Sequence, residues 1–458
     1  MKKYDAIIIG FGKGGKTLAG YLGKLGKKVA VIEKSNKMYG GTCINIGCIP
    51  TKKLVHKSKI ALYKELSTFE EKALEYKKAI EEKEDLTEML RQKNFNMLND
   101  NENIDIYTGV ASFVSSNIVE VKMENEKVSL EGEKIFINTG ASTIIPDIPG
   151  INDSNKIYTS TTIMELKELP KNLVVVGGGY VGLEFASIYA SFGSNVTVIE
   201  TADRIAKRED EDISDNIKSA LEKKGISFIL NAKVKSFNDN GNEVVVSYID
   251  TSSNLEMGVK GDAILIATGR KANIEALNLE VAGVKLTERG AVAVDNRLRT
   301  NIDNIWAIGD VNGGPQFTYI SLDDFRIIKD NLFGEGKRTI DDRNFTIYSV
   351  FIDPSLARVG LNETEARKAG YDIKVAKLPV SSIPRARVIN EIKGMMKAIV
   401  DSKTNKILGC TLLCAEANEL INIVSTAMKA EVEYTFLRDN IFTHPTMSEA
   451  LNDLFSLI

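Results

Sequence analysis

The chain has 458 residues, of which 43% are apolar and 26% are charged, and its formal net charge is −3. This length exceeds one ordinary hydrophobic core and predicts roughly two to four domains. Basic and acidic residues nearly balance, so the charge does not favour nucleic acid or an anionic membrane as a partner. Because no stretch approaches the ~20 apolar residues that cross a bilayer, and cysteines are few, we expect a cytoplasmic protein that acts on small molecules or proteins.

An apolar strand over residues 4–10 opens the chain and runs directly into the sequence GFGKGG. Its glycines Gly10, Gly12 and Gly15 have the G-x-G-x-x-G spacing, a helical stretch follows, and a second strand ends in Glu33. In such a βαβ unit the glycines let the backbone approach a pyrophosphate, and the acidic residue accepts hydrogen bonds from a ribose. A glycine turn alone is weak evidence, but the complete series in register predicts a dinucleotide site.

Residues 40–50, GGTCINIGCIP, contain two of the four cysteines, Cys43 and Cys48. On a regular helix five residues separate the α-carbons by about 8 to 9 Å, whereas a disulfide tolerates up to about 7 Å. A bond between them therefore requires a distorted helix, and Gly47 provides the backbone freedom for it. Two buried thiols that pack as small hydrophobic groups are the alternative. The preceding dinucleotide unit favours a redox-active pair, the usual role of a disulfide in a reducing compartment.

Two segments separate the cysteines from the next glycine pattern, and we assign no chemistry to the first of them. Residues 57–100 are dense in Lys and Glu with apolar residues at helical spacing, which predicts helices with a solvated face. Residues 110–137 alternate as β-hairpins, and Thr139 and Gly140 close that segment.

The glycine pattern then recurs. A strand over residues 172–176 precedes Gly177, Gly179 and Gly182, a helix follows, and the next strand ends in Glu200. A chain with two such units binds two different dinucleotides, or the same one twice, and the cysteines follow the first unit. We therefore place a flavin at the first unit and a nicotinamide at the second.

The residue at the end of that strand bears on the choice of nicotinamide. Glu200 would bind a free 2′-hydroxyl and repel a 2′-phosphate, which favours NADH over NADPH. NADPH stays possible, because Arg204, Lys207 and Arg208 are close enough in sequence to reach a phosphate.

Two later strands end at positions where α/β proteins collect ligands. The first, over residues 264–268, ends just before Gly269, and the second leads into Gly309 and Asp310. For Asp310 we favour a bond to a cofactor hydroxyl over a plain helix N-cap. From residue 344 onward the chain has strands and helices but no glycine fingerprint, so we expect an α+β module with a substrate or dimer role.

Five motifs in this order resemble those of the flavin-dependent, class I pyridine nucleotide-disulfide oxidoreductases, which include dihydrolipoamide dehydrogenase, glutathione reductase and mercuric reductase. They are GGTCINIGCIPTK, GGGYVGLEFA, ATGRKAN, IWAIGD and HPTMSE. The resemblance covers nearly the whole chain and implies an α/β fold with two Rossmann-like domains, for FAD and NAD(P), and a C-terminal α+β dimerisation domain. The implied boundaries are 1–145 with 272–340 for FAD, 146–271 for NAD(P) and 341–458 for the interface.

The resemblance also implies roles for single residues. Cys48 is the thiol nearest the flavin, and Cys43 is the interchange thiol that meets the substrate. His444 matches the general acid/base and Glu449 the carboxylate that orients it. In the family this pair comes from the other subunit, so a homodimer with a shared site is implied. The only other histidine, His56, has no such context, and a structural role is the simpler interpretation.

The remaining implied site residues bind cofactors. Lys52 and Glu184 match a pair beside the flavin, and Asp310 matches a ligand of its ribityl chain. The full cofactor-binding set is Gly10, Gly12, Gly15, Glu33, Gly41, Thr42, Lys52, Thr139, Gly140, Gly177, Gly179, Gly182, Glu200, Gly269, Gly309 and Asp310. We assign no metal ligand.

This sequence differs from the better-known members of the family at several motif positions, and these differences indicate which branch it resembles. The C-terminal sequence NDLFSLI has no cysteine pair of the kind mercuric reductase uses, Glu200 stands where glutathione reductase has an arginine, and Phe442 stands where dihydrolipoamide dehydrogenase usually has a histidine. FTYISLDDFRI replaces the usual alanine-rich helix after the GD motif. We interpret Cys410 and Cys414 as packing residues.

With GFGKGGKTLAG, IPRARV and FTHPTMSEALNDLF, these features resemble the reactive-chlorine-resistance branch of bacterial enzymes. Its members are hypothiocyanous acid reductases, and copper(II) reduction has also been attributed to the branch. The resemblance implies that electrons pass from NADH through FAD to a Cys43–Cys48 disulfide and on to a small oxidant. Three alternatives stay open. They are a disulfide reductase like dihydrolipoamide dehydrogenase or mercuric reductase, a flavin-binding redox sensor, and a metal-handling protein that uses Cys43, Cys48 and His56.

Overall fold

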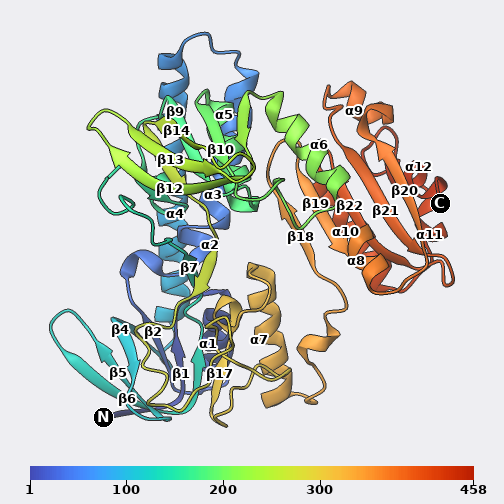
Figure 1. Cartoon of the computed structure of the whole chain (residues 1–458). Coiled ribbons are helices and arrows are strands. Elements are labelled where there is room, and N and C mark those ends of the chain that lie inside the picture. Colours follow the sequence, from blue (N-terminus) through green and yellow to red (C-terminus); the bar gives the residue numbers. More distant parts are fainter. The chain divides into compact units, whose positions relative to one another are not determined.

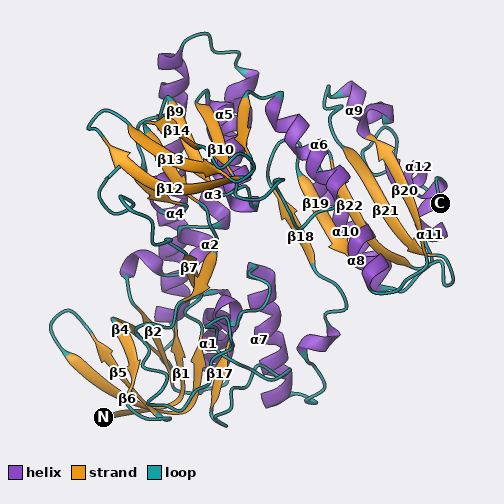
Figure 2. Ribbon diagram, viewed as in Figure 1, coloured by secondary structure: helices purple, strands orange, loops and turns teal.

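The computed structural model describes all residues, Met1–Ile458, and divides them into two compact units, which are described separately. Unit 1 comprises residues 1–54, 78–144 and 269–343, and unit 2 comprises residues 55–77, 145–268 and 344–458. Figure 1 follows the chain through them, and Figure 2 shows that both mix helices with strands. The expected α/β class is therefore confirmed.

Unit 1 is built on a seven-stranded sheet in the order β3-β2-β1-β6-β5-β4, with β17 paired to β6. The strands β3, β2, β1, β6 and β17 are parallel, and β4 and β5 are added as antiparallel hairpins. The bounds are β1 (Lys2–Ile9), β2 (Val29–Glu33), β3 (Ile104–Thr108), β4 (Val110–Phe113), β5 (Ile118–Lys122), β6 (Lys127–Ile137) and β17 (Ile305–Ala307). The predicted hairpins at residues 110–137 are confirmed.

Unit 1 also contains helices and short strands outside this sheet. Helix α1 starts immediately after the first glycine turn and packs against α7. The remaining elements are α1 (Lys13–Lys24), η1 (Asn36–Met38), α2 (Thr42–Asn45), the first part of α3 (Cys48–Tyr63), most of α4 (Phe69–Asn99), β7 (Ala141–Thr143), β16 (Arg270–Ala272), η3 (Gly309–Asn312), α7 (Thr318–Phe333) and η4 (Ile340–Asp342).

Successive residues of β1 enter two different cores, as the two-residue period of a strand requires. Ile7 and Ile9 belong to one buried cluster with residues of the hairpins. Ile8 belongs to another, with apolar residues of α1 and α7. Because both faces of the sheet are covered, β1 needs a continuous apolar run, which is the pattern that its sequence shows.

Unit 2 contains a second parallel sheet, in the order β11-β10-β9-β15-β8, and a three-stranded antiparallel sheet, β12-β13-β14. Helix α5 follows the second glycine turn, as α1 follows the first. The bounds are β8 (Ile157–Thr159), η2 (Thr162–Glu165), β9 (Asn172–Val176), α5 (Tyr180–Phe192), β10 (Asn195–Ile199), α6 (Glu211–Glu222), β11 (Ile226–Ile229), β12 (Ala232–Asp239), β13 (Val244–Asp250), β14 (Glu256–Gly261) and β15 (Ala263–Ile266).

The C-terminal part of unit 2 has a five-stranded antiparallel sheet in the order β18-β19-β22-β21-β20, with α10 packed on β19 and β22. It matches the α+β module expected after residue 344. The bounds are β18 (Ile347–Val350), β19 (Leu356–Gly360), α8 (Glu363–Lys368), β20 (Ile373–Pro379), η5 (Val380–Ser382), α9 (Pro384–Val388), β21 (Met395–Asp401), β22 (Ile407–Leu413), α10 (Ala417–Lys429), α11 (Thr435–Arg438) and α12 (Ala450–Ser456). No helix combines the length and apolar character that a membrane span requires.

Candidate active site

The three glycines of the first turn pack against one buried residue, Asn138, Gly10 against its backbone and Gly12 and Gly15 against its side chain. A Cβ at Gly10, whose φ is +106°, would lie 2.2 Å from the Asn138 carbonyl oxygen, and one at Gly12 would lie 2.5 Å from its Oδ1. The Gly15 N–H donates to that Oδ1 at 3.0 Å, and the Asn138 amide donates to the Ile308 carbonyl at 2.7 Å. Asn138 therefore ties the turn to β6 and β17, a role that the sequence analysis missed.

Each glycine turn is joined to the acidic residue that ends the next strand. A side-chain oxygen of Glu33 accepts the Phe11 N–H at 3.1 Å, and one of Glu200 accepts the Gly178 N–H at 2.6 Å. Burial raises the pKa of Glu33. The two predicted units thus have the same internal geometry, with a carboxylate at the strand end beside the glycine backbone, where a ribose is bound.

The starts of α1 and α5 fit the pyrophosphates of two dinucleotides. Gly12 and Gly179 are the N-cap residues, neither helix has a side-chain cap, and neither has an acidic residue in its first turn. A Cβ at Gly179 would meet nothing within 4 Å. Uncapped helix N-termini offer N–H groups and a positive dipole end to an anion, so these residues suit FAD and NAD(P)H.

Other predicted cofactor residues converge on the first turn. A Cβ at Gly41 would lie 2.7 Å from the Gly12 α-carbon, and one at Gly140 would lie 4.0 Å from the Thr42 hydroxyl. Thr139 donates its hydroxyl to the Asn273 carbonyl at 2.7 Å.

Gly309, in the IWAIGD motif, also lies beside the first glycine turn. Gly309 lies against Ser321 and the Asn138 amide, and a Cβ there would meet them at 2.8 and 3.3 Å. Asp310 is in η3, whose N-cap is Ile308 without a side-chain cap, so Asp310 is not the plain N-cap considered above. Burial raises the pKa of Asp310, and the charge of Arg270 acts against this.

Cys43 and Cys48 lie on separate helices. Helix α2 ends at Asn45 and α3 begins at Cys48, so the helix is interrupted between the cysteines as their spacing required. A Cβ at Gly47 would lie 2.9 Å from the Thr42 carbonyl oxygen, which explains the glycine. Both cysteines are free thiols, and Cys48 is exposed.

The two thiols share one proton unequally. A hydrogen bond from Cys43 to Cys48 raises the pKa of Cys43 and lowers that of Cys48. The Thr318 hydroxyl lies 3.4 Å from the Cys48 sulfur and, together with the charge of Lys52, further lowers the pKa of Cys48. Cys48 is thus the stabilised thiolate, and Cys43 keeps the proton.

Helix α7 supplies the site with three polar side chains that the sequence analysis did not assign. Thr318 contacts Cys48, Ser321 accepts the Gly14 N–H at 3.1 Å, and Asp324 accepts the Gly309 N–H at 2.7 Å. Spaced three residues apart, they share one face of the helix. They all come from FTYISLDDFRI, the segment noted as a departure from the usual alanine-rich helix.

Lys16 is a further residue that was missed. It is buried on α1, and its ammonium donates to the Gly40 carbonyl at 3.3 Å and contacts the Asn94 side-chain oxygen. Burial lowers the pKa of Lys16 to about 8. Its charge in turn lowers the pKa of Cys43, against the larger effects of Cys48 and burial. Its place directly after the last glycine of the first turn was the only sequence signal.

His444 and Glu449 form the predicted pair within unit 2. The His444 Nδ1 lies 2.8 Å from Oε2 of Glu449, whose other oxygen accepts the Thr446 N–H at 3.3 Å. The His444 side chain is 71% exposed. A carboxylate accepts only, so Nδ1 carries the proton and Nε2 is left to accept one from a reaction partner.

The positions of the other candidate residues do not indicate a catalytic role. Glu184 is buried on α5 and accepts the Phe351 N–H at 2.7 Å, while His56 is exposed on α3. Cys410 and Cys414 are buried in the C-terminal core, which matches their interpretation as packing residues. No three His, Cys, Asp or Glu side chains gather into a group that could hold a metal ion.

The chain's match to known families decides the identification. Residues 4–324 match the family model described as pyridine nucleotide-disulphide oxidoreductase, and residues 346–455 match that family's dimerisation domain. The chain belongs to the pyridine nucleotide-disulphide oxidoreductases. Members of this family use FAD and NAD(P)H, the two cofactors expected for the glycine units. His444 and Glu449 lie within the residues that match the dimerisation domain.

Relatives cover the full length of this oxidoreductase. It is 52% identical over 458 residues, all of both chains, to the probable pyridine nucleotide-disulfide oxidoreductase RclA of Escherichia coli K12. It is 34% identical to a mercuric reductase of Staphylococcus aureus, with 98% of this chain and 81% of that protein covered. It is also 34% identical to dihydrolipoyl dehydrogenase of Bacillus subtilis 168, with 97% and 94% covered.

A solved structure agrees with these relatives. The Cu(II) complex of the HOCl-induced flavoprotein disulfide reductase RclA from Escherichia coli is 52% identical, covers 100% of both chains and superposes with a TM-score of 0.93. The oxidoreductase is therefore an enzyme of the flavoprotein disulfide reductase type. The three-domain boundaries, the Lys52–Glu184 pair and the shared site between subunits stay predictions.

Proposed function

We propose that this flavoprotein disulfide reductase uses NADH to reduce hypothiocyanous acid to thiocyanate, with Cys43 and Cys48 as the reacting thiols. One observation carries the proposal. The Cys48 sulfur lies 3.4 Å from the Thr318 hydroxyl, and its hydrogen bond with Cys43 lowers the pKa of Cys48 and raises that of Cys43. These opposite shifts match the proton count of the reaction, because a dithiol with one proton and one hypothiocyanous acid give one disulfide, one thiocyanate and one water.

The first step forms a mixed sulfur adduct. His444 of the partner subunit takes the proton from Cys43 at its free Nε2, and Glu449 stabilises the imidazolium. The Cys43 thiolate attacks the sulfur of hypothiocyanous acid, so that a sulfur–sulfur bond forms as the sulfur–oxygen bond breaks. The imidazolium gives its proton to the departing hydroxide, which leaves as water, and His444 is again neutral.

The second step releases thiocyanate. Cys48, held as thiolate by Thr318 and Lys52, attacks the Cys43 sulfur and forms the intramolecular disulfide. Thiocyanate is the leaving group. FAD, when bound at the first glycine unit, supplies two-electron transfer from NADH that returns the disulfide to the dithiol.

Two facts favour a small oxidant over a protein disulfide or lipoamide. The only other cysteines, Cys410 and Cys414, are buried in a core where burial raises their pKa, so they cannot relay electrons outward. The relative at 52% identity is described as HOCl-induced, whereas the mercuric and dihydrolipoyl enzymes are 34% identical. We place the enzyme in the cytoplasm, where NADH is available.

A panel of acceptors tests the proposal. Purified holoenzyme should oxidise NADH with hypothiocyanous acid at a kcat/KM at least about a hundredfold above that with lipoamide, if hypothiocyanous acid is the acceptor for which the site is specific. Cys43→Ser should abolish this turnover, and Cys410→Ala, which removes a buried thiol, should leave it unchanged. Equal or faster turnover with lipoamide would refute the assignment.

Copper(II) is a second candidate acceptor, because the solved relative is described as a Cu(II) complex. Oxidation of one dithiol would reduce two Cu(II) ions to Cu(I) and release the thiol proton. If Cys43→Ser and Cys48→Ser lose hypothiocyanous acid turnover but keep copper reduction, the two activities use different groups.

A further inference from the structure

The loop that follows Glu200, residues 201–210, is held at both ends. It leaves the acidic residue of the nicotinamide unit and leads into α6. It carries Arg204, Lys207 and Arg208, the basic side chains nearest in sequence to the ribose-binding position. Whatever fixes this loop therefore bears on how the enzyme recognises its nucleotide.

The first end is attached to the second glycine turn. Glu200 accepts the Gly178 N–H at 2.6 Å and the Ala202 N–H at 2.8 Å. Ala206 donates its N–H back to the Gly178 carbonyl at 2.9 Å. Its φ is +44°, a left-handed conformation that L residues with a side chain rarely adopt. Such a conformation persists only when the surroundings hold it in place.

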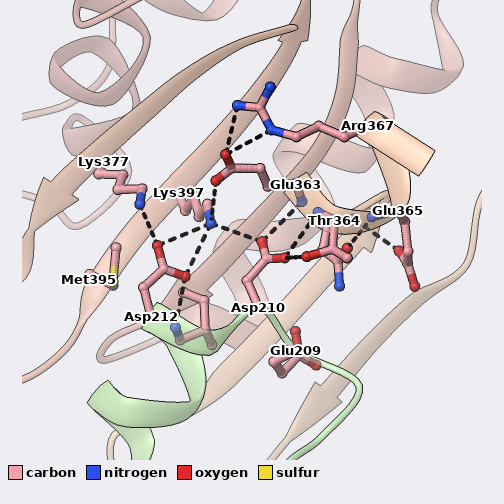
Figure 3. Close-up of polar contacts among 12 residues, drawn as sticks. Glu209, Asp210, Asp212, Glu363, Thr364, Glu365, Arg367, Lys377, Met395 and Lys397 are labelled. Carbon is pink, nitrogen blue, oxygen red and sulfur yellow. Dashed lines mark hydrogen bonds and ion pairs between the residues drawn. The ribbon is translucent and has the colours of Figure 1, made fainter. Parts of the chain in front are cut away.

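The other end is anchored on the C-terminal part of unit 2. Asp210 accepts hydrogen bonds from the Glu363 N–H at 3.0 Å and from the Thr364 N–H and hydroxyl at 3.1 and 2.8 Å. It also pairs with the Lys397 ammonium at 2.9 Å. Figure 3 shows these groups converging on the Asp210 carboxylate from α8 and β21. A carboxylate with four donors has no freedom to move.

Lys397 is the centre of this anchor. Its side chain is 2% exposed, and its ammonium also pairs with Asp212 and Glu363 at 3.0 and 2.9 Å. Lys377 lies at the solvent-exposed edge of this cluster. It pairs only with Asp212, at 2.6 Å, and its side chain is half exposed. The two lysines thus touch the same cluster, but only Lys397 touches the residue that ends the loop.

The residues just before Asp210 are fixed in the same way. The Arg208 carbonyl accepts from the Arg358 guanidinium and the Asn362 amide, both at 3.1 Å. Buried Glu209 accepts from the hydroxyls of Tyr180 and Tyr348 at 2.5 Å. Tyr180 directly follows Gly179, so the anchor also reaches the helix start beside the glycine turn.

We propose that Lys397 and Asp210 are positioning residues for the nicotinamide nucleotide. They hold residues 201–210 between the glycine turn and the C-terminal sheet, which keeps Glu200 at the ribose position and restricts the backbone that carries the three basic residues. This rests on the proposed function only in placing NADH at the second glycine unit. Releasing the anchor weakens NADH binding and relaxes the preference for NADH over NADPH.

Asp210→Asn tests this, because it keeps the shape of the side chain while it removes its charge and one acceptor. We expect the Kd of the holoenzyme for NAD⁺, measured by titration calorimetry, to rise about fivefold, with kcat nearly unchanged. The ratio of kcat/KM for NADH to that for NADPH should fall about tenfold. Lys397→Arg should stay within about threefold of wild type, since it retains the ammonium's role as a charged donor.

Lys377→Gln is the matched control, because it removes a charge from the same cluster without touching the loop. It should leave both Kd and the nucleotide ratio within about twofold of wild type. If Asp210→Asn does not fold, Thr364→Val removes one anchor hydrogen bond and should shift the same two readouts in the same direction. An unchanged Kd and nucleotide ratio in a variant with lowered melting temperature would overturn the proposal and leave a purely stabilising cluster. The calorimetric readout needs no oxidant, so it stands even if hypothiocyanous acid is not the substrate.

Discussion

The Thr318 hydroxyl lies 3.4 Å from the Cys48 sulfur, although 270 residues separate the two in the chain. Thr318 is the first residue of α7, whose N-terminal dipole also favours a nearby negative charge. The hydrogen bond from Cys43 lowers the pKa of Cys48 most, and this contact and the charge of Lys52 lower it further, against the effect of burial. In the proposed cycle Cys43 attacks the oxidant and Cys48 closes the disulfide.

Replacing this hydroxyl should weaken the thiolate. Thr318→Val removes a hydrogen bond to a charged sulfur and should raise the pKa of Cys48 by about one unit. Below that pKa the thiolate fraction, and hence the rate of Cys48 alkylation by iodoacetamide, should fall about tenfold. Mass spectrometry of the labelled peptide across a pH series measures this. Thr318→Ser keeps the hydroxyl and should behave as wild type, and an identical pH profile for Val and Thr would contradict the assignment.

His444 should matter to the chemistry and not to the fold, because its ring is exposed. His444→Gln should lower kcat about 10²- to 10⁴-fold, the usual contribution of a general acid/base. Glu449→Gln should cost less, about tenfold, since it weakens the orientation of the ring without removing it. Full activity in His444→Gln would eliminate it as the acid/base.

The shared site has its own test in mixed dimers. Cys43→Ser and His444→Gln are each inactive in this account, but a hybrid dimer contains one site with both residues intact. Refolding or co-expressing equal amounts should restore about a quarter of wild-type activity. No recovery in a verified hybrid would place both residues in the same subunit's site.

Alanine substitutions in the two glycine turns should impair the binding of different cofactors. Gly12→Ala would push a Cβ to 2.5 Å from Asn138 and should yield protein depleted of FAD, as judged by its flavin absorbance. Gly179→Ala meets no atom within 4 Å, so it should keep FAD and melting temperature but raise the KM for NADH about tenfold. Gly20→Ala, whose Cβ is 3.6 Å from Leu98, is the matched helix control and should change neither. Loss of FAD in Gly179→Ala would refute this division of the cofactors.

The cluster around Lys397 should make stability depend on acid pH. Burial favours protonated Asp212, but hydrogen bonds from Lys377 and Lys397 outweigh it and lower the pKa of Asp212 below 3.8. A carboxyl group with a lowered pKa stabilises the folded state above its unfolded pKa, and this is lost as pH falls through the folded value. Between pH 6 and 3 the apparent melting temperature should therefore fall less, by about 2 °C, in Asp212→Asn than in wild type. Parallel curves would show that Asp212 does not contribute.

Local pattern predicted the scaffold well. The βαβ units and the interrupted helix between Cys43 and Cys48 follow from local spacing, because turns, strand ends and helix periods are short-range properties. The same is true of the buried Cys410 and Cys414, which sit in an apolar strand and its end. The His444–Glu449 pair was implied by the resemblance of the HPTMSE motif to the family.

The contacts that tune the site are long-range and gave no local signal. Asn138 at the glycine turn, Thr318 at Cys48, and the Asp210–Lys397 anchor each join segments more than a hundred residues apart. The sequence marked FTYISLDDFRI as unusual, but only the fold shows that its polar face points at the cysteines and glycine turns. Acceptor identity is also beyond local pattern, since the same dithiol geometry serves several oxidants.

A single-turnover measurement tests the central claim most directly. The dithiol enzyme, reduced with NADH and freed of excess reductant, is mixed with one equivalent of hypothiocyanous acid, and thiocyanate and free thiols are counted. The account predicts one thiocyanate released and two thiols lost per site, with Cys48→Ser releasing none and retaining the thiocyanate label on Cys43. Thiocyanate formation without loss of these two thiols, or a label on another residue, would contradict it.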